Sequence, residues 1–199
     1  MNKIKLIITA TMFAVLSMVL QLTALETGTG MNLDLVAVPW VLSAFLLGPV
    51  GGAITVAVSY LFIALQSSAG WVGATIKLVA SLPLVAVFAF VSIRTKNFSK
   101  NLIFGTSSVN PSRALLFGMF SLAIVARVLI AHTVNAWFTF PMFGIPVDAN
   151  IDSLFSVPLR VSVSWIGIID VLNIIQSLIE FAIVYVLIFK TKIRERLHA

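Results

Sequence analysis

Long apolar runs fill most of this chain, and they restrict the environment in which it can fold. The runs cover about residues 4–24, 36–48, 50–67, 71–93, 113–140 and 161–189. Hydrophobic residues make up 60% of the 199-residue chain and charged residues only 10%, whereas a soluble domain carries about a quarter charged residues. A chain so poor in charge cannot cover itself for water, and the sequence therefore predicts an all-α integral membrane protein.

The basic residues lie beside the apolar runs and indicate an orientation. Ten of the 13 Lys and Arg residues fall in three clusters, which are Lys3 and Lys5; Arg94, Lys96, Lys100 and Arg113; and Lys190, Lys192, Arg194 and Arg196. Six crossings place all three clusters on one side, as expected for the cytoplasmic side, whereas five crossings would split them. The same clusters explain the net charge of +6 without any nucleic acid as a partner.

We therefore expect one membrane domain over residues 1–199, with six transmembrane helices and both termini in the cytoplasm of a cell. The first run lacks a cleavage site followed by a soluble domain, so it is expected to be a retained span in a multi-pass protein of the cell membrane. The second run is short for a crossing, which needs about 20 residues. It ends at the turn signal "GPVGG" (Gly48–Gly52) and is predicted to be a short or tilted span.

Several classes of chemistry find no support in the sequence. The chain has no cysteine, which excludes disulfides and thiol-based sites. It shows no HExxH motif, no paired acidic motif at helical spacing, no Gly-x-Ser-x-Gly and no phosphate-binding Gly-Lys-Ser/Thr loop. We expect no catalytic residues, no metal site and no enzyme activity, and any ATP hydrolysis has to come from partner subunits.

Charged side chains within apolar spans are costly and usually face the interior of a helix bundle. Four are present, namely Lys77, Arg127, Asp170 and Glu180, and their polar companions are His132, Asn135, Asn173 and Gln176. At 100° per residue, Asp170, Asn173, Ser177 and Glu180 share one face of the last helix. Lys77, Asn135, Asp170 and Asn173 fall in the outer half of their spans or near the midplane. This placement predicts a polar pocket that opens to the outside.

Structural explanations of the same residues stay open. Lys77 with Asp170, or Arg127 with Glu180, would also form buried structural pairs, the second being favoured because both residues lie deep. His132 is expected to be a satisfied interior residue. The four tryptophans (Trp40, Trp71, Trp137 and Trp165) are expected at the membrane interface, with an aromatic wall for a flat ligand as the alternative at Trp137.

The outer loops are predicted at 25–35, 66–70 and 141–160, and the inner loop at about 94–113. The glycine-containing loop 25–35 is expected to close over a ligand.

Small residues form a line on the first helix. Ala10, Ala14 and Ser17 share one face of it. Such a line favours close packing against another helix, either inside the chain or in a second protein.

With this line of small residues, the chain resembles the substrate-binding S components of energy-coupling factor (ECF) vitamin transporters. These are small six-helix membrane proteins whose first helix typically carries an Ala-x-x-x-Ala motif, matched here by Ala10 and Ala14. In that family the motif docks the transmembrane coupling subunit, which works with ATPase subunits. The resemblance implies the same partners here, and it implies that the alanine face contacts another protein.

Four stretches resemble the riboflavin-specific member of that family. The stretch "LDLVAVPWVLSAFLLGPVGG" contains the matching residues Asp34, Pro39, Gly48, Pro49 and Gly52, and "GWVGATIKLVASLPL" resembles the start of the fourth helix. "VNAWFTFPMF" resembles a segment of the family in which an Asn lines the flavin site, and Asn135 stands at the position of that Asn. "IIDVLNIIQSLI" resembles a Phe-Asn-x-x-Lys segment whose Asn and Lys contact the ligand in the family. Asn173 stands at the position of that Asn, and Gln176 stands in place of that Lys. The implied ligand is riboflavin or a related vitamin, carried as substrate rather than as a cofactor.

The departures from this pattern concern charge. Ala37 replaces a second Asp, Gln176 replaces the Lys, and Lys77 adds a Lys where an uncharged residue is expected. An anionic group would suit Lys77, which keeps pantothenate, another acidic vitamin or a phosphorylated flavin as alternatives. The expected function is high-affinity vitamin binding for an ATP-dependent importer. The expected substrate-binding residues are Asp34, Lys77, Asn135, Asp170, Asn173 and Gln176. A self-sufficient small-solute transporter remains the alternative from a different class.

Overall fold

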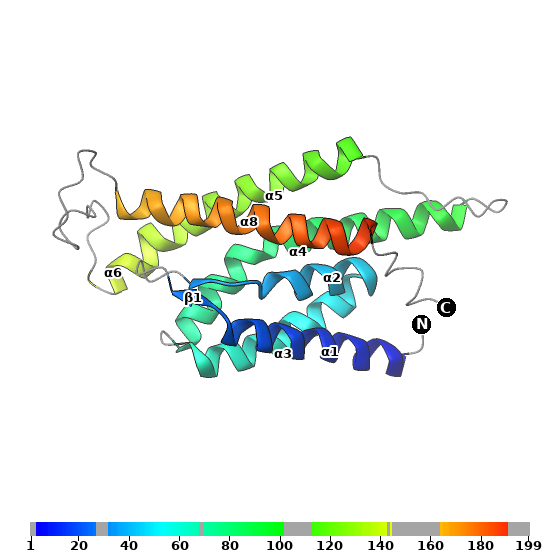
Figure 1. Cartoon of the computed structure of the whole chain (residues 1–199), viewed down its shortest axis with the longest axis horizontal. Coiled ribbons are helices and arrows are strands. Elements are labelled where there is room, and N and C mark those ends of the chain that lie inside the picture. Colours follow the sequence, from blue (N-terminus) through cyan, green and yellow to red (C-terminus); the bar gives the residue numbers. More distant parts are fainter. Residues whose placement is uncertain are drawn as a thin grey trace.

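The fold is a helix bundle in which consecutive long helices run in opposite directions (Figure 1). The computed structural model describes residues 3–26, 32–67, 70–101, 113–142, 144 and 164–190. The main helices are α1 (Lys3–Leu22), α2 (Ala37–Leu46), α3 (Pro49–Gln66), α4 (Gly70–Asn101), α5 (Arg113–Val134) and α8 (Trp165–Phe189). A π-helical turn, η1 (Asn135–Thr139), and the short α6 (Phe140–Met142) continue α5. Strands β1 (Leu25–Glu26) and β2 (Asn32–Leu33) pair antiparallel between α1 and α2.

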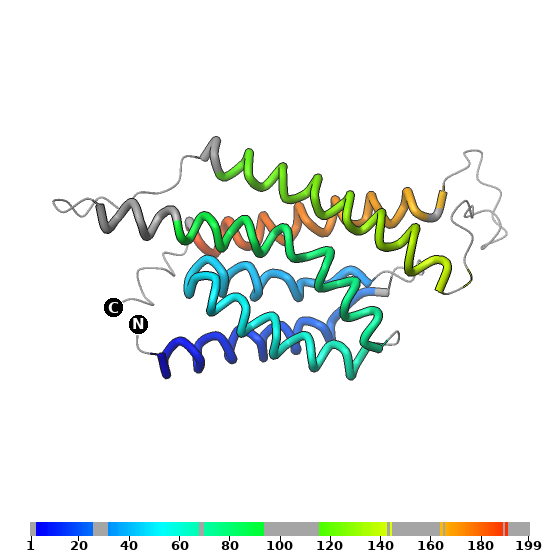
Figure 2. Tube along the Cα trace, turned by 180° about the vertical axis from the view of Figure 1, so that it is seen from behind, coloured from blue at the N-terminus to red at the C-terminus, as the bar shows by residue number. Residues whose placement is uncertain are grey.

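Among the described residues, five helices are long and apolar enough to cross a membrane. They correspond to the first, third, fourth, fifth and sixth apolar runs, and the prediction of an all-α, multi-pass membrane protein is confirmed at this level. The start of α1 and the end of α8 lie at one end of the bundle, and the β1–β2 hairpin and α6 lie at the other (Figures 1 and 2). We call these the terminal end and the hairpin end.

The second apolar run forms α2, which lies at the centre of the bundle and contacts α1, α3, α4 and α8 (Figure 1). All ten of its residues are buried. Ten helical residues span only about 15 Å, about half of the hydrocarbon core of a bilayer. Because other helices enclose α2 on all sides, its length does not have to match the membrane.

The turn from α2 to α3 brings the two helices very close together. Only Leu47 and Gly48 separate them, and Gly48 adopts a left-handed φ of 91° ahead of Pro49, the first residue of α3. A Cβ atom on Gly52 would lie 2.8 Å from the Cβ of Ala44, closer than side chains normally approach. The predicted turn is present, and its glycines serve both the turn and the helix contact.

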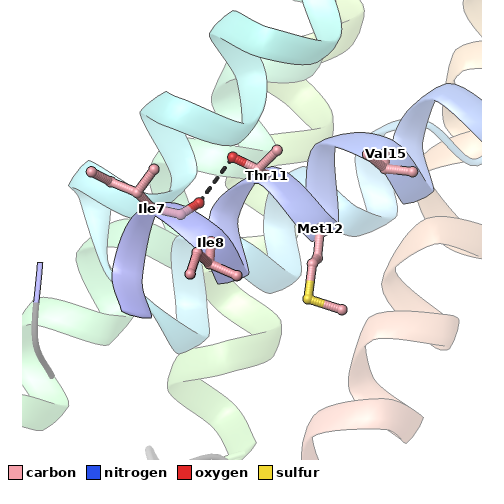
Figure 3. A pocket seen from close by; sticks show the side chains of 5 residues that line it. All are labelled: Ile7, Ile8, Thr11, Met12 and Val15. Carbon is pink, nitrogen blue, oxygen red and sulfur yellow. Dashed lines mark hydrogen bonds between the residues drawn. The ribbon is translucent and has the colours of Figure 1, made fainter. Parts of the chain in front are cut away.

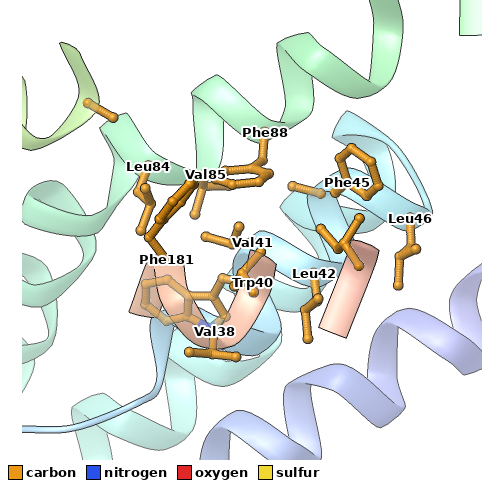
Figure 4. Packing of buried hydrophobic residues seen from close by; sticks show 14 of the residues in the cluster. Val38, Trp40, Val41, Leu42, Phe45, Leu46, Leu84, Val85, Phe88 and Phe181 are labelled. Carbon is orange, nitrogen blue, oxygen red and sulfur yellow. The ribbon is translucent and has the colours of Figure 1, made fainter. Parts of the chain in front are cut away.

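An aromatic layer lies between the polar residues of α8 and the terminal end. The rings of Phe120 and Phe181 are stacked with their centroids 3.7 Å apart, and Phe88 and Phe117 lie against Phe181 at 6.4 and 5.6 Å. Figure 4 shows Phe88 and Phe181 beside the residues of α2.

The small residues of α1 pack inside the chain. Ala10, Ala14 and Ser17 are all fully buried, and the hydroxyl of Thr55 on α3 donates to the carbonyl of Ala10 at 3.0 Å. Ala10 and Ala14 thus have no exposed surface in this structure for the predicted docking of a second protein, and that docking stays a prediction. Small side chains let the backbones of α1 and α3 approach closely, and this contact takes up the whole alanine face.

The outer face of α1 is aliphatic instead. A shallow groove there is lined by Ile7, Ile8, Thr11, Met12 and Val15 (Figure 3). The hydroxyl of Thr11 donates to the carbonyl of Ile7 in its own helix, at 2.9 Å, so it offers the surroundings little polarity. This face suits contact with lipid chains.

Some predicted boundaries and exposures change. Helix α4 continues to Asn101, eight residues past the apolar run, because hydropathy marks the end of the membrane-embedded part and not the end of the helix.

Trp40 is 1% exposed and donates to Ser59 at 2.6 Å, so its predicted interface position is wrong. Trp71 and Trp137 are 63% and 82% exposed, as interface residues would be. Most of the predicted loops 94–113 and 141–160 lies outside the described residues.

We predict that Ala14→Leu destabilises the protein by about 1–3 kcal/mol, because added methylenes in a closely packed contact force the helices apart. The neighbouring exchange Val15→Leu is the matched control, since Val15 is 51% exposed and has room for the larger side chain. Thermal unfolding of the detergent-purified variants measures the difference. Equal unfolding temperatures for the two variants would contradict the internal packing of the alanine face.

Candidate functional site

The candidate site is built around a short non-helical segment, Asp34–Val36, that leads into α2. Backbone groups without a helix need other partners when they are buried. The carbonyl of Val36 accepts from the hydroxyl of Ser17 at 3.0 Å, and the carbonyl of Asp34 accepts from the side-chain amide of Gln176 at 2.9 Å. The N–H of Val36 donates to the Asp34 carboxylate at 2.9 Å. Side chains from α1 and α8 thus replace the missing helical hydrogen bonds.

The carboxylate of Asp34 forms an ion pair with Lys77 of α4. Its Oδ2 atom lies 2.5 Å from the Lys77 Nζ, and the Asp34 side chain is 1% exposed. The same ammonium group donates to the side-chain oxygen of Gln21, near the end of α1, at 2.6 Å. Three parts of the chain therefore meet at one lysine, and the predicted alternative pairing of Lys77 with Asp170 is wrong.

A second ion pair lies deeper in the bundle, as predicted. The guanidinium of Arg127 on α5 donates to the Glu180 carboxylate of α8 at 2.6 Å, and the two side chains are 4% and 0% exposed. Gln176 donates to the same carboxylate at 2.9 Å. Because Gln176 also bonds the carbonyl of Asp34, its amide group joins the two ion pairs into one network.

Asn173 belongs to this network as well. Its side-chain oxygen accepts from the Nε of Arg127 at 3.3 Å, and its amide nitrogen donates to the carbonyl of Ile169 at 2.9 Å. Asn173 is 3% exposed. The side chain is thereby held in one orientation at the border between the polar network and the α5–α8 contact.

The network lies below the exposed tryptophans of the hairpin end. Lys77 follows Trp71 by six residues, and His132 precedes Trp137 by five. At 1.5 Å per helical residue these polar groups lie about 8–9 Å deeper than the tryptophan rings. If the tryptophans mark the membrane interface, the polar layer is embedded in the outer part of the hydrocarbon.

Asp170 pairs with His132 across the α5–α8 contact. The imidazole Nδ1 lies 2.8 Å from the Asp170 Oδ2, and the side chains of His132 and Asp170 are 49% and 20% exposed. The expectation that His132 is satisfied is confirmed, but the expectation that it is an interior residue is wrong. The other carboxylate oxygen of Asp170 is buried without a hydrogen-bond partner among the described residues.

Asn135 begins the π-helical turn η1 and is 7% exposed. The hydroxyl of Thr139 bonds the carbonyl of Val134 at 3.3 Å, five residues earlier, which fits the wider π-helical spacing. A single π-turn shifts the following side chains around the helix axis, and such turns are frequent at functional sites. The sequence analysis expected an ordinary helix here.

The structure brings most of the predicted site residues together. Asp34, Lys77, Gln176 and Asn173 belong to one network, while Asp170 lies beside it in its own pair. The sequence analysis missed Gln21, although Gln21 continues the spacing of Ala10, Ala14 and Ser17 along one face of α1. The glycine-containing loop that was expected to close over a ligand is anchored by the β1–β2 hairpin, whose residues 27–31 lie outside the described residues.

Comparison of the chain with family models, with curated proteins and with solved structures found no match.

We predict that Lys77→Met destabilises the protein by about 3 kcal/mol, because it leaves the buried Asp34 carboxylate without its counter-charge. The double variant Lys77→Met/Asp34→Asn should recover most of the loss, since it removes both charges and keeps the oxygen that accepts from Val36. Thermal unfolding of the single and double variants gives the coupling between the two positions. Additive losses in the double variant would show that the pair does not interact.

Proposed function

We propose that the chain is the substrate-binding subunit of an ATP-dependent ECF-type vitamin importer, and that its ligand is riboflavin. In this proposal the chain crosses the cell membrane six times, with both termini in the cytoplasm. Coupling and ATPase subunits supply the energy, and the chain itself catalyses no reaction. The resemblance described for the sequence and the polar layer at the hairpin end support the proposal.

The observation that carries the choice of ligand is the pairing of charges. Lys77 pairs with Asp34, and Arg127 pairs with Glu180. Both cations of the polar network thus have a carboxylate partner. A site neutralised in this way favours an uncharged ligand such as riboflavin over the acidic vitamins that Lys77 suggested from the sequence alone.

Unused acceptor atoms support the same ligand class. The side-chain oxygen of Gln176 and the Oδ1 of Asp170 are buried without a hydrogen-bond partner among the described residues. Both would accept hydrogen bonds from a donor-bearing ligand, and a flavin carries an imide N–H and several hydroxyl groups. The amide of Asn135 offers both a donor and an acceptor to such a ligand.

The aromatic layer favours binding over conduction. The polar network ends at Glu180, and the stacked rings of Phe120 and Phe181 follow directly below it. A self-sufficient transporter or channel needs a polar path to the other side. Among the described residues, the aromatic layer lies next to the polar network, an arrangement that supports holding a ligand for a partner to release.

The test of this proposal is the absorption spectrum of the detergent-purified protein, followed by mass spectrometry of the molecules that heat releases from it. A co-purifying yellow flavin is the expected result. A colourless protein whose tryptophan fluorescence is not quenched by added riboflavin would contradict the flavin assignment.

A variant locates the site. We predict that Asn135→Ala weakens riboflavin binding by about 10- to 100-fold, as expected for losing one or two hydrogen bonds of a buried amide. Thr133→Ala is the matched control, because Thr133 is exposed on the same helix and bonds only its own backbone in the described structure. Fluorescence titration with riboflavin gives both affinities, and equal losses in the two variants would contradict a specific role for Asn135.

A further inference from the structure

We infer that Asp34 is a specificity-determining residue: its carboxylate occupies the ammonium group of Lys77 and thereby excludes anionic ligands from the site. The inference rests on the proposed function, because it concerns the ligand of that same site. In this role Asp34 acts as a permanent counter-ion of Lys77 and does not itself contact the ligand.

Lys77 is the cation that an anionic ligand would reach. Its side chain is 19% exposed, whereas that of Arg127 is only 4% exposed. Lys77 also lies only about 9 Å below Trp71 by helical rise, at the end of the bundle where the hairpin lies. A carboxylate or phosphate entering from that end would meet Lys77 before it met Arg127.

Asp34 is fixed in place, which makes it a permanent partner of this lysine. One carboxylate oxygen accepts from the N–H of Val36 at 2.9 Å, and the other accepts from Lys77. The carbonyl of the same residue is held by Gln176. Three neighbouring groups thus bond to residue 34, and its side chain has little freedom to turn away.

Displacement of Asp34 by a ligand would be costly. An anion that took over Lys77 would leave the Asp34 carboxylate buried, charged and unpaired, and a buried charge without a partner is strongly unfavourable. A neutral ligand can instead accept a hydrogen bond from Lys77 without disturbing the ion pair. The ion pair therefore selects against anionic ligands, while Lys77 can still donate a hydrogen bond to a neutral flavin.

The test removes the negative charge and keeps the shape. In Asp34→Asn, the side-chain oxygen can still accept from Val36, but Lys77 loses its counter-charge. The probes are riboflavin, flavin mononucleotide with its added phosphate, and 8-carboxyriboflavin with a carboxylate on the ring. We expect the affinity for at least one of the anionic flavins, relative to riboflavin, to rise by about tenfold or more. The double variant Asp34→Asn/Lys77→Gln should lose this gain.

A second variant decides the matter if Asp34→Asn does not fold. Gln21→Lys places another cation beside the ion pair without altering the segment that leads into α2, and it should produce the same relative gain. Thr23→Lys is its matched control, since Thr23 is exposed nearby and bonds the carbonyl of Leu20. The control adds the same charge outside the network and should leave the ratio of affinities unchanged.

The outcomes separate the two proposals. A wild-type protein that binds none of the three flavins overturns the proposed function, and this inference with it. A wild-type protein that binds riboflavin, together with variants that show no relative gain for either anionic flavin, overturns the role of Asp34 alone. An equal gain in Gln21→Lys and Thr23→Lys would assign the effect to general electrostatic attraction and would also overturn that role.

Discussion

The helix arrangement depends on one constraint: the buried backbone groups of the short segment Asp34–Val36 must all find hydrogen-bond partners. Asp34–Val36 enters the bundle ahead of the first residue of α2, and within it the carbonyl of Leu35 accepts from the Val38 N–H at 3.0 Å. Such backbone is tolerated at membrane depth only where protein supplies the partners. Ser17, Gln176 and the Asp34 carboxylate supply them. Because these groups come from α1, α8 and the segment itself, the positions of both helices relative to α2 are fixed by the same set of bonds.

The two ion pairs extend this constraint to α4 and α5. Buried ion pairs add little net stability, since desolvation offsets most of their attraction, but removal of one partner is strongly destabilising. Their effect is to specify which helices meet and at what height. The polar layer is thereby held between the contact of α6 with α8 at the hairpin end, where Phe140, Ile166 and Ile169 pack together, and the aromatic layer on the other side. A site with this form can be complementary to a ligand without being open to both sides of the membrane.

The sequence predicted the helices well and their pairing poorly. The apolar runs located every main helix to within a few residues at most boundaries, because lipid and a buried core impose the same demand for apolar side chains. Helical periodicity correctly placed Asn173 and Glu180 on one face of the last helix. It could not show which helix that face meets, and Lys77 therefore was considered with Asp170, whereas Asp34, expected within an outer loop, is its partner. The sequence likewise did not show which helix the Ala10–Ala14 face contacts, because small residues permit a close contact with any helix.

The network also gives a physical account of the charges by which the chain departs from the family that it resembles. That resemblance predicts a lysine at position 176 and an uncharged residue at position 77. In the structure, the Nζ of Lys77 and the side-chain nitrogen of Gln176 both bond to residue 34, one at its carboxylate and the other at its carbonyl. Lys77 of α4 therefore supplies a positive charge to residue 34, whereas the resemblance assigns a lysine at position 176 to ligand contact. Under the proposed function, the layer thus carries its positive charge on α4 instead of α8, and Gln176 joins Asp34 to the deeper pair.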